Sequence, residues 1–204
     1  MNDLQGQVKE AVQILRRGGV IVLPTDTVYG LGADAFNSNA VDRIYEIKQR
    51  SRHLPLPLLL SDISQITMIA ESVPRIGWLL ANRFWPGGLT LVLPKIASLP
   101  SYLSGGHTIA VRIPNHPVCL AVIEGLGRPI IGTSANISGT PSCLTVDEVK
   151  RQLGDKVDII LDGGRCPGGG ESTIVDVTGK VPVILRQGII AQHEIDNVFG
   201  DSVR

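Results

Sequence analysis

Two polar segments begin where apolar runs end, and both carry side chains that could bind a ligand. Residues 24–32 (PTDTVYGLG) and residues 132–139 (GTSANISG) each follow a predicted strand. Open α/β sheets bind ligands at the carboxyl ends of their strands. Ser134 and Asn136 are two residues apart, so in extended backbone their side chains face the same way. Their hydroxyl and amide groups could hydrogen-bond a nucleotide; ordinary Asp/Thr and Asx/Ser turns are the alternative interpretation.

A third segment is cationic. Residues 48–53 (KQRSRH) lie at the C-terminal end of a predicted helix and include Lys48, Arg50 and Arg52. A cation at a helix C-terminus stabilises the macrodipole, which is enough to explain Lys48. It explains Arg50 and Arg52 less well, because they continue past the helix into a loop. Cations in a loop suit phosphate binding, since Arg can donate two parallel hydrogen bonds to phosphate oxygens and Lys supplies a point charge.

The fourth segment, residues 162–173 (DGGRCPGGGEST), has five glycines whose backbone N–H groups could form an anion cradle. A flexible turn between strands is the interpretation we favour for most of them. The segment is not a Walker A loop, because no Gly-Lys-Ser/Thr follows, and no GxGxxG follows a strand. The histidines have no partner pattern for a Ser-His-Asp triad. Trp78 and Trp85 are expected to be core anchors rather than stacking platforms.

The elements that must position these segments are predicted from apolar periodicity and from turn and capping residues. Helices are expected over residues 8–15, 41–47, 74–84, 116–124 and 145–153. Strands are expected over residues 20–23, 56–60, 89–93, 108–113, 129–133, 157–161, 173–177 and 183–185. Ser38 or Asn39 is expected to cap the second helix, and Thr145 with Glu148 forms a capping-box pattern. Pro57 suggests an edge strand or a bulge.

The order of these elements predicts one α/β domain over residues 1–204. Strands and helices alternate irregularly, and some strands follow one another directly. This pattern argues for a mixed parallel and antiparallel sheet with flanking helices. No repeat, linker or low-complexity stretch interrupts it.

Composition excludes several classes of protein. Hydrophobic residues make up 43 % of the chain and the formal net charge is +0, so neither disorder nor a strongly basic nucleic-acid binder is expected. A local basic groove could still make a weak contact with tRNA or other RNA. The three cysteines form no CxxC pair, which favours a reducing compartment and argues against zinc. The N-terminus reads as neither a signal peptide nor a membrane span, so we expect a cytoplasmic protein without membrane contact.

The four segments, in this order, resemble the YrdC family of threonylcarbamoyl-AMP synthases. The stretches that carry the resemblance are PTDTVYGLGA, IYEIKQR, FWPGGLTLVLP, IAVRIPNHP, GTSANISGTPS, ILDGG, ESTIVDVTG and ILRQGII. The motif-bearing region covers about residues 8–190, nearly the whole chain, and matches the short, single-domain form. The resemblance implies a twisted open sheet with a positively charged concave cavity.

The resemblance also implies an activity: L-threonine, bicarbonate and ATP, used with Mg²⁺, give threonylcarbamoyl-AMP and pyrophosphate. A separate complex then transfers the group to the adenosine next to the anticodon of ANN-decoding tRNAs. This chemistry needs positioning and charge neutralisation more than a covalent nucleophile, and that suits a site rich in Lys, Arg, Ser, Thr and Asn.

Site roles carry over from the family by position. Lys48, Arg50, Ser134 and Asn136 complete the Lys-x-Arg and Ser-x-Asn signatures and are assigned to catalysis. The positions matched to threonine are Thr27, Arg112, Gly132 and Ser172. The positions matched to ATP are Arg50, Thr108, Ser134, Ser142 and Arg186. No residue is assigned to a protein-bound metal. Leu54 and Leu59 depart from relatives, which often carry polar residues there.

Two alternatives stay open at this point. The first is a non-catalytic RNA-binding or regulatory YrdC-like domain, which the neutral net charge and the few aromatic residues disfavour. The second is a paralogue, or a carbamoyl-phosphate-linked domain of the same fold with other chemistry, because fold does not fix function.

Overall fold

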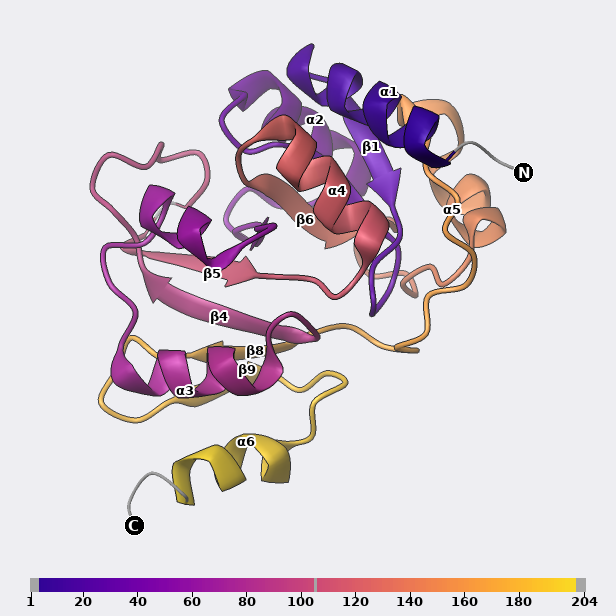
Figure 1. The fold of residues 1–204 in the computed structure, drawn as a ribbon. Helices are drawn as coiled ribbons and strands as arrows, with labels where there is room; N and C mark the ends of the chain where they lie inside the picture. The colour runs from indigo at the N-terminus through magenta and orange to yellow at the C-terminus, as the bar shows by residue number, and fades with distance from the viewer. Residues whose placement is uncertain (1–3, 105, 201–204) are drawn as a thin grey trace.

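The computed structural model describes residues 4–104 and 106–200, and a nine-stranded sheet runs through this part of the chain (Figure 1). Its strand order is β7-β1-β2-β6-β3-β5-β4-β8-β9. The strands are β1 Val20–Leu23, β2 Gly30–Asp34, β3 Leu58–Leu59, β4 Leu89–Pro94, β5 Thr108–Arg112, β6 Ile130–Ser134, β7 Ile159–Ile160, β8 Thr173–Asp176 and β9 Val183–Arg186. Neighbouring strands pair in both directions, so the predicted mixed open sheet with flanking helices is confirmed.

Helices cover the sheet in two groups. They are α1 Leu4–Arg16, α2 Ser38–Lys48, α3 Arg75–Phe84, α4 Pro117–Leu126, α5 Val146–Leu153 and α6 Gln192–Gly200, with 3-10 helices at Ile63–Met68 and Gly154–Lys156. Figure 1 shows α1 beside α4 near one end of the sheet, with α3 and α6 near β8 and β9 at the other end.

The four apolar residues of β1 serve two separate hydrophobic cores. Val20 and Val22 belong to the larger core, which also includes buried residues of α2. Ile21 and Leu23 belong to the smaller core, packed with buried residues of α1 and α4. Successive side chains of a strand point to opposite faces, so a strand covered on both sides reads as a continuous apolar run.

A strand that was not predicted, β2, begins within the segment expected to be a loop after β1. β2 is fully buried and pairs antiparallel with both β1 and β6. Its glycines concealed it, because glycine is depleted in strands. Gly32 packs tightly: a Cβ there would lie 3.0 Å from Leu23 Cδ2 and 3.3 Å from Ile130 Cδ1. The α6 helix was not predicted either.

Three further expectations were wrong in detail. β3 lies between β6 and β5, so Pro57 marks neither a sheet edge nor a bulge but the residue before a short internal strand. The residue that caps α2 is Asn37, whose Oδ1 accepts a hydrogen bond from Ala40 N at 3.1 Å. Trp78 is 39 % exposed and is not a core anchor.

Other expectations are confirmed. Thr145 and Glu148 form the predicted capping box at the start of α5. Trp85 is partly buried against the larger core, and its Nε1 donates to Leu89 O at 2.8 Å. Among the described residues, no helix has both the length and the apolar character needed to span a bilayer.

Candidate active site

A cavity of about 250 Å³, close to the size range of small-molecule sites, is lined by residues at the ends of several strands and in the loops beside them. It gathers nearly all of the predicted site residues: Thr27, Lys48, Arg50, Arg112, Gly132, Ser134, Asn136, Ser172 and Arg186. The described lining includes four cationic side chains and one carboxylate, Glu171. The predicted positively charged cavity therefore exists.

The loop that carries Thr27 is closed by hydrogen bonds from its own first threonine. Thr25 Oγ1 accepts from Thr27 N at 3.1 Å and donates to Val28 O at 2.6 Å. This is a short hydroxyl-to-backbone turn of the kind that Ser and Thr favour. The turn is almost wholly buried, and it presents Thr27 to the cavity.

Arg112 at the end of β5 is held from three sides. Its Nη1 donates to Thr27 Oγ1 at 2.8 Å, its Nη2 pairs with Asp26 Oδ1 at 2.6 Å, and its Nε donates to Gly87 O at 2.9 Å. Arg112 is only 6 % exposed, and burial lowers its pKa although the Asp26 carboxylate opposes the change. The guanidinium is thus rigidly placed beside the Thr27 hydroxyl, as a carboxylate-binding group needs to be.

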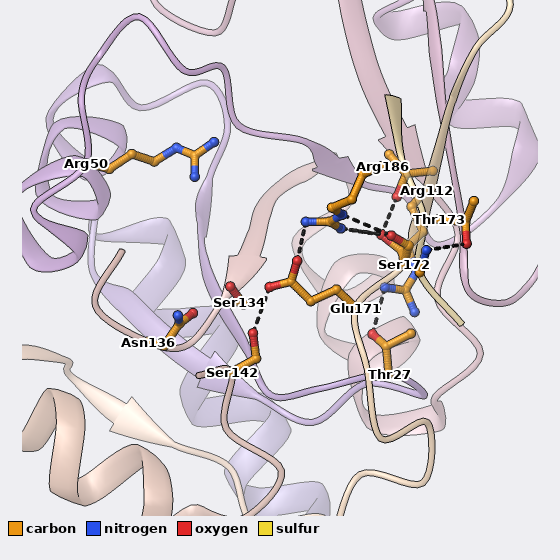
Figure 2. Close-up of polar contacts among 12 residues, drawn as sticks. Thr27, Arg50, Arg112, Ser134, Asn136, Ser142, Glu171, Ser172, Thr173 and Arg186 are labelled. Carbon is orange, nitrogen blue, oxygen red and sulfur yellow. Dashed lines mark hydrogen bonds and ion pairs between the residues drawn. The ribbon is translucent and has the colours of Figure 1, made fainter. Parts of the chain in front are cut away.

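Glu171, Ser172 and Arg186 form a second polar cluster, which Figure 2 shows opposite Arg50. Arg186 Nη1 pairs with Glu171 Oε2, and Arg186 Nη2 donates to Ser172 O at 2.9 Å. Ser142 Oγ donates to Glu171 Oε1 at 2.7 Å, and the Ser172 and Thr90 hydroxyls are 2.8 Å apart. Burial would raise the pKa of Glu171, but the Ser142 hydrogen bond and the Arg186 charge lower it overall.

Lys48 is buried instead of solvated at the end of α2. It is 2 % exposed, and its Nζ donates to Ser134 O at 2.5 Å, Asn136 O at 2.8 Å and Asn136 Oδ1 at 3.3 Å. Burial, with a smaller effect of the nearby Arg50 charge, lowers its pKa to about 8. Lys48 therefore fixes the loop after β6, and the surface macrodipole explanation does not describe it.

Arg50 reaches the cavity from the opposite wall (Figure 2). Its Nε and Nη2 donate to the carbonyl oxygens of Leu54 and Pro55, both at 3.2 Å. No carboxylate lies within ion-pair distance of Arg50 in the part of the chain that the structure describes. Arg52, by contrast, pairs with Asp42 and lies over the Tyr45 ring, away from the cavity.

Two predicted ATP residues lie outside the cavity lining. Ser142 touches it indirectly through Glu171. Thr108 lies at the far end of β5, where it shares one face of the strand with Ala110 and Arg112 because strand side chains alternate. A ligand that contacts both Arg112 and Thr108 would have to extend along β5.

The Ser-x-Asn segment is not extended as expected. Asn136 N donates back to Ser134 O at 3.0 Å, so the backbone turns at Ala135, yet both side chains line the cavity. Gly132 is required by a close approach, because a Cβ there would lie 2.1 Å from Leu59 Cγ. Leu59 thus forms part of the cavity wall, whereas the Leu54 side chain is 52 % exposed.

The glycine-rich segment, residues 162–173, contributes Glu171 and Ser172 to the cavity lining, but none of its glycines lines the cavity. A Cβ at Gly168 would lie 2.5 Å from Asp26 O and 2.8 Å from Thr27 Cα, so this glycine lets the segment pack against the Thr27 loop. The favoured interpretation, that most of these glycines form a turn, agrees with this arrangement.

Sequence reasoning missed Glu171, Thr90 and Asp26 as members of the site. All three residues lie in the recognised motifs, so the motifs contained the signal, but no single residue pattern marked their partners. No cluster of three or more His, Cys, Asp or Glu side chains suited to a metal is found among the described residues. Both Glu171 oxygens already accept protein donors, so a Mg²⁺ ion would fit only if phosphate oxygens and water supply most of its ligands.

The chain matches a known family model and is similar to several known proteins. The sequence model named for Sua5, YciO and YrdC, described as "Telomere recombination", matches residues 13–188. The threonylcarbamoyl-AMP synthase of Pyrococcus abyssi is 43 % identical over 96 % of this chain and 58 % of its own length. That of Vibrio cholerae is 36 % identical over 89 % of this chain and 97 % of its own length. The chain therefore spans little more than half of some curated relatives and nearly all of others.

Two solved structures share the fold closely. P. abyssi Sua5 complexed with L-threonine superimposes with a TM-score of 0.93 at 43 % identity, covering 96 % of this chain and 58 % of that one. Escherichia coli YciO superimposes with a TM-score of 0.85 at 32 % identity, covering 94 % of this chain and 93 % of that one.

Proposed function

The chain belongs to the Sua5/YciO/YrdC family, and from this premise we propose that it forms threonylcarbamoyl-AMP and pyrophosphate from L-threonine, bicarbonate and ATP. It would then be a nucleotidyltransferase. One observation carries the proposal: a single cavity joins a hydroxyl-and-guanidinium wall, suited to an amino acid, to a group of cations suited to phosphates. The likeness to a relative that was solved with L-threonine supports the first half of this assignment.

Threonine is assigned to the wall formed by Thr27, Arg112 and Ser172. A buried guanidinium suits a substrate carboxylate, and fixed hydroxyls suit the threonine hydroxyl and amine. Because Gly132 has no side chain, Leu59 packs directly against it in the cavity wall. The side chain of a bound amino acid would contact this apolar surface.

ATP is assigned to the cationic part of the cavity, which adjoins the threonine wall through the contact between Arg186 and Ser172. Arg50, Ser134, Ser142 and Arg186 would bind the phosphates, and a nucleotide extended along β5 would reach Thr108. Thr108 lies four residues from Arg112, a span of about 13 Å in a strand. A Mg²⁺ ion carried on the triphosphate would supply further charge neutralisation when bound.

The reaction requires positioning and charge stabilisation. The threonine amine and bicarbonate form a carbamate with release of water, and a carbamate oxygen then attacks the α-phosphate as pyrophosphate leaves. Arg50 and Arg186 would stabilise the negative charge on the phosphates, while Lys48 holds the backbone that carries Ser134 and Asn136. The thiols do not serve as nucleophiles in this scheme, because all three cysteines are buried and burial raises the pKa of each.

The product is a mixed anhydride and needs an acceptor. We propose that it passes to a separate complex that modifies the adenosine beside the anticodon of ANN-decoding tRNAs, in the cytoplasm. A weak direct contact with tRNA is compatible with the cationic cavity but is not needed for synthesis.

Product analysis tests the assignment. The protein is incubated with ATP, Mg²⁺, bicarbonate and either threonine, serine or valine, and the products are identified by mass spectrometry. A site that pairs a substrate hydroxyl rejects an analogue without it, so valine should be used at least about 100-fold less efficiently than threonine. Pyrophosphate release that needs neither threonine nor bicarbonate would contradict the proposal, and RNA binding without any product would favour the non-catalytic alternative.

A further inference from the structure

Glu171 lies where the residues assigned to ATP meet. Ser142 Oγ donates to its Oε1 at 2.7 Å, and Arg186 Nη1 pairs with its Oε2. The Ser134 hydroxyl also acts on this carboxylate and helps to lower its pKa. One carboxylate therefore uses the donors of two side chains that the proposed function assigns to phosphate, Ser142 and Arg186 (Figure 2).

This environment would suit a phosphate group equally well. Hydroxyls and a guanidinium contact the Glu171 carboxylate directly, and the positive charges of Lys48 and Arg50 also act in its favour. Glu171 is the one acidic residue in the described lining of the cavity. An ionised carboxylate and a phosphate oxygen accept the same charge-assisted hydrogen bonds, so they compete for one set of donors.

We propose that Glu171 occupies the phosphate subsite in the ligand-free protein and releases its donors when the triphosphate of ATP binds. This inference rests on the proposed function, because it requires ATP in this cavity. Before binding, the carboxylate orients Arg186 and offsets the repulsion among the cations of the lining. After binding, phosphate oxygens accept from Arg186 and Ser142 in its place.

Space is available for this exchange. The Glu171 side chain is 34 % exposed, so it can turn towards solvent without entering a packed core. A carboxylate that stayed among the phosphates would repel them, because like charges a few ångströms apart interact strongly at a partly buried site. Glu171 is therefore a positioning residue that also competes with the nucleotide.

ATP affinity, measured without turnover, distinguishes a competing carboxylate from a scaffold. Isothermal titration calorimetry with ATP and Mg²⁺, in the absence of threonine and bicarbonate, is applied to the unaltered chain, Glu171→Gln and Glu171→Ala. Both variants should bind ATP about tenfold more tightly, because one charge-assisted contact no longer has to be broken. Glu124→Gln, an equal charge change at an exposed position of α4, should bind ATP as the unaltered chain does.

Weaker ATP binding by the variants than by the unaltered chain would overturn the proposal. If Glu171 is only a scaffold, both variants bind ATP more weakly and Glu171→Ala binds it most weakly. Thermal melting reports whether each variant folds, and Glu171→Gln, which keeps the size of the side chain, decides alone if Glu171→Ala does not. ATP binding by the unaltered chain with equal or weaker binding by Glu171→Gln refutes this inference alone. An unaltered chain that binds no ATP refutes the proposed function, and the inference with it.

Discussion

Replacing Lys48 by Met tests what holds the Ser134–Asn136 backbone in place. The substitution keeps a long apolar stem but leaves the two Asn136 acceptor oxygens without their donor, whereas Ser134 O keeps the hydrogen bond from Asn136 N. Each such acceptor costs about 1–3 kcal/mol. Removing the ammonium also removes the cost of burying its charge, roughly 3 kcal/mol of unfolding free energy, since burial moves its pKa from 10.5 to about 8. Central values for the two acceptors leave a net loss of about 1 kcal/mol of unfolding free energy near pH 7.

The pH dependence has a definite sign. Between about pH 8 and pH 10.5 the unfolded chain holds the Lys48 proton more firmly than the folded chain does, so stability rises with pH in this window. Met does not titrate. The stability difference between the unaltered chain and Lys48→Met should therefore grow by about 2 kcal/mol from about pH 7.5 to pH 9.5. Urea denaturation at both pH values measures it, with exposed Lys9→Met as the control.

Turnover provides the second measurement. The three Nζ donors already have protein acceptors, so we expect Lys48 to act through the loop. Lys48→Met should lower threonylcarbamoyl-AMP formation by about 10²-fold, the lower end of the range for losing one transition-state donor. The loss should shrink in an Asn136→Ala background, because both residues hold one segment. Additive losses would mean that Lys48 acts on the phosphates directly.

The reasoning would be refuted by a Lys48→Met variant with unchanged stability and turnover. That result would assign Lys48 to the surface macrodipole effect, which is worth only about 0.3–1 kcal/mol. A stability difference that shrinks as the pH rises would refute the lowered pKa specifically, because it would mean that the carbonyl oxygens hold the charged form more firmly than water does.

Arg112→Lys should raise the KM for threonine at least about tenfold and leave ATP affinity nearly unchanged, because Lys cannot replace the forked contacts to Asp26 and Thr27; an unchanged KM would contradict this. Thr145→Ala should lower the unfolding free energy by about 1 kcal/mol through loss of the capping box, with turnover intact. Urea denaturation measures the stability and a product assay measures the turnover. A fall in turnover would show that α5 is coupled to the site. Cys119 should resist thiol reagents at pH 8 until urea unfolds the chain, because it is wholly buried and burial raises its pKa; fast labelling of the folded protein would contradict this.

Local pattern in the sequence determined much of the framework. The apolar run of β1, the capping box at Thr145 and the mixed order of strands and helices were all readable, because periodicity and capping depend on residues close together in the chain. Most residues of the cavity lie in the motifs that carry the family resemblance, so the sequence identified them before their geometry was known. β2 was not predicted, because its glycines are atypical of strands, and the side chains of β1 and β6 that pack closely over Gly32 come from other segments of the chain.

Only the tertiary structure decided what the polar side chains do. By position Lys48 ends a helix, yet its acceptors lie 86 and 88 residues further along the chain. The hydrogen bond of Glu171 with Ser142 likewise joins residues that are 29 positions apart in the chain. Burial and charge pairing depend on neighbours that folding supplies, so the sequence identified most of the polar residues of the cavity, and long-range packing determined which partners each of them has.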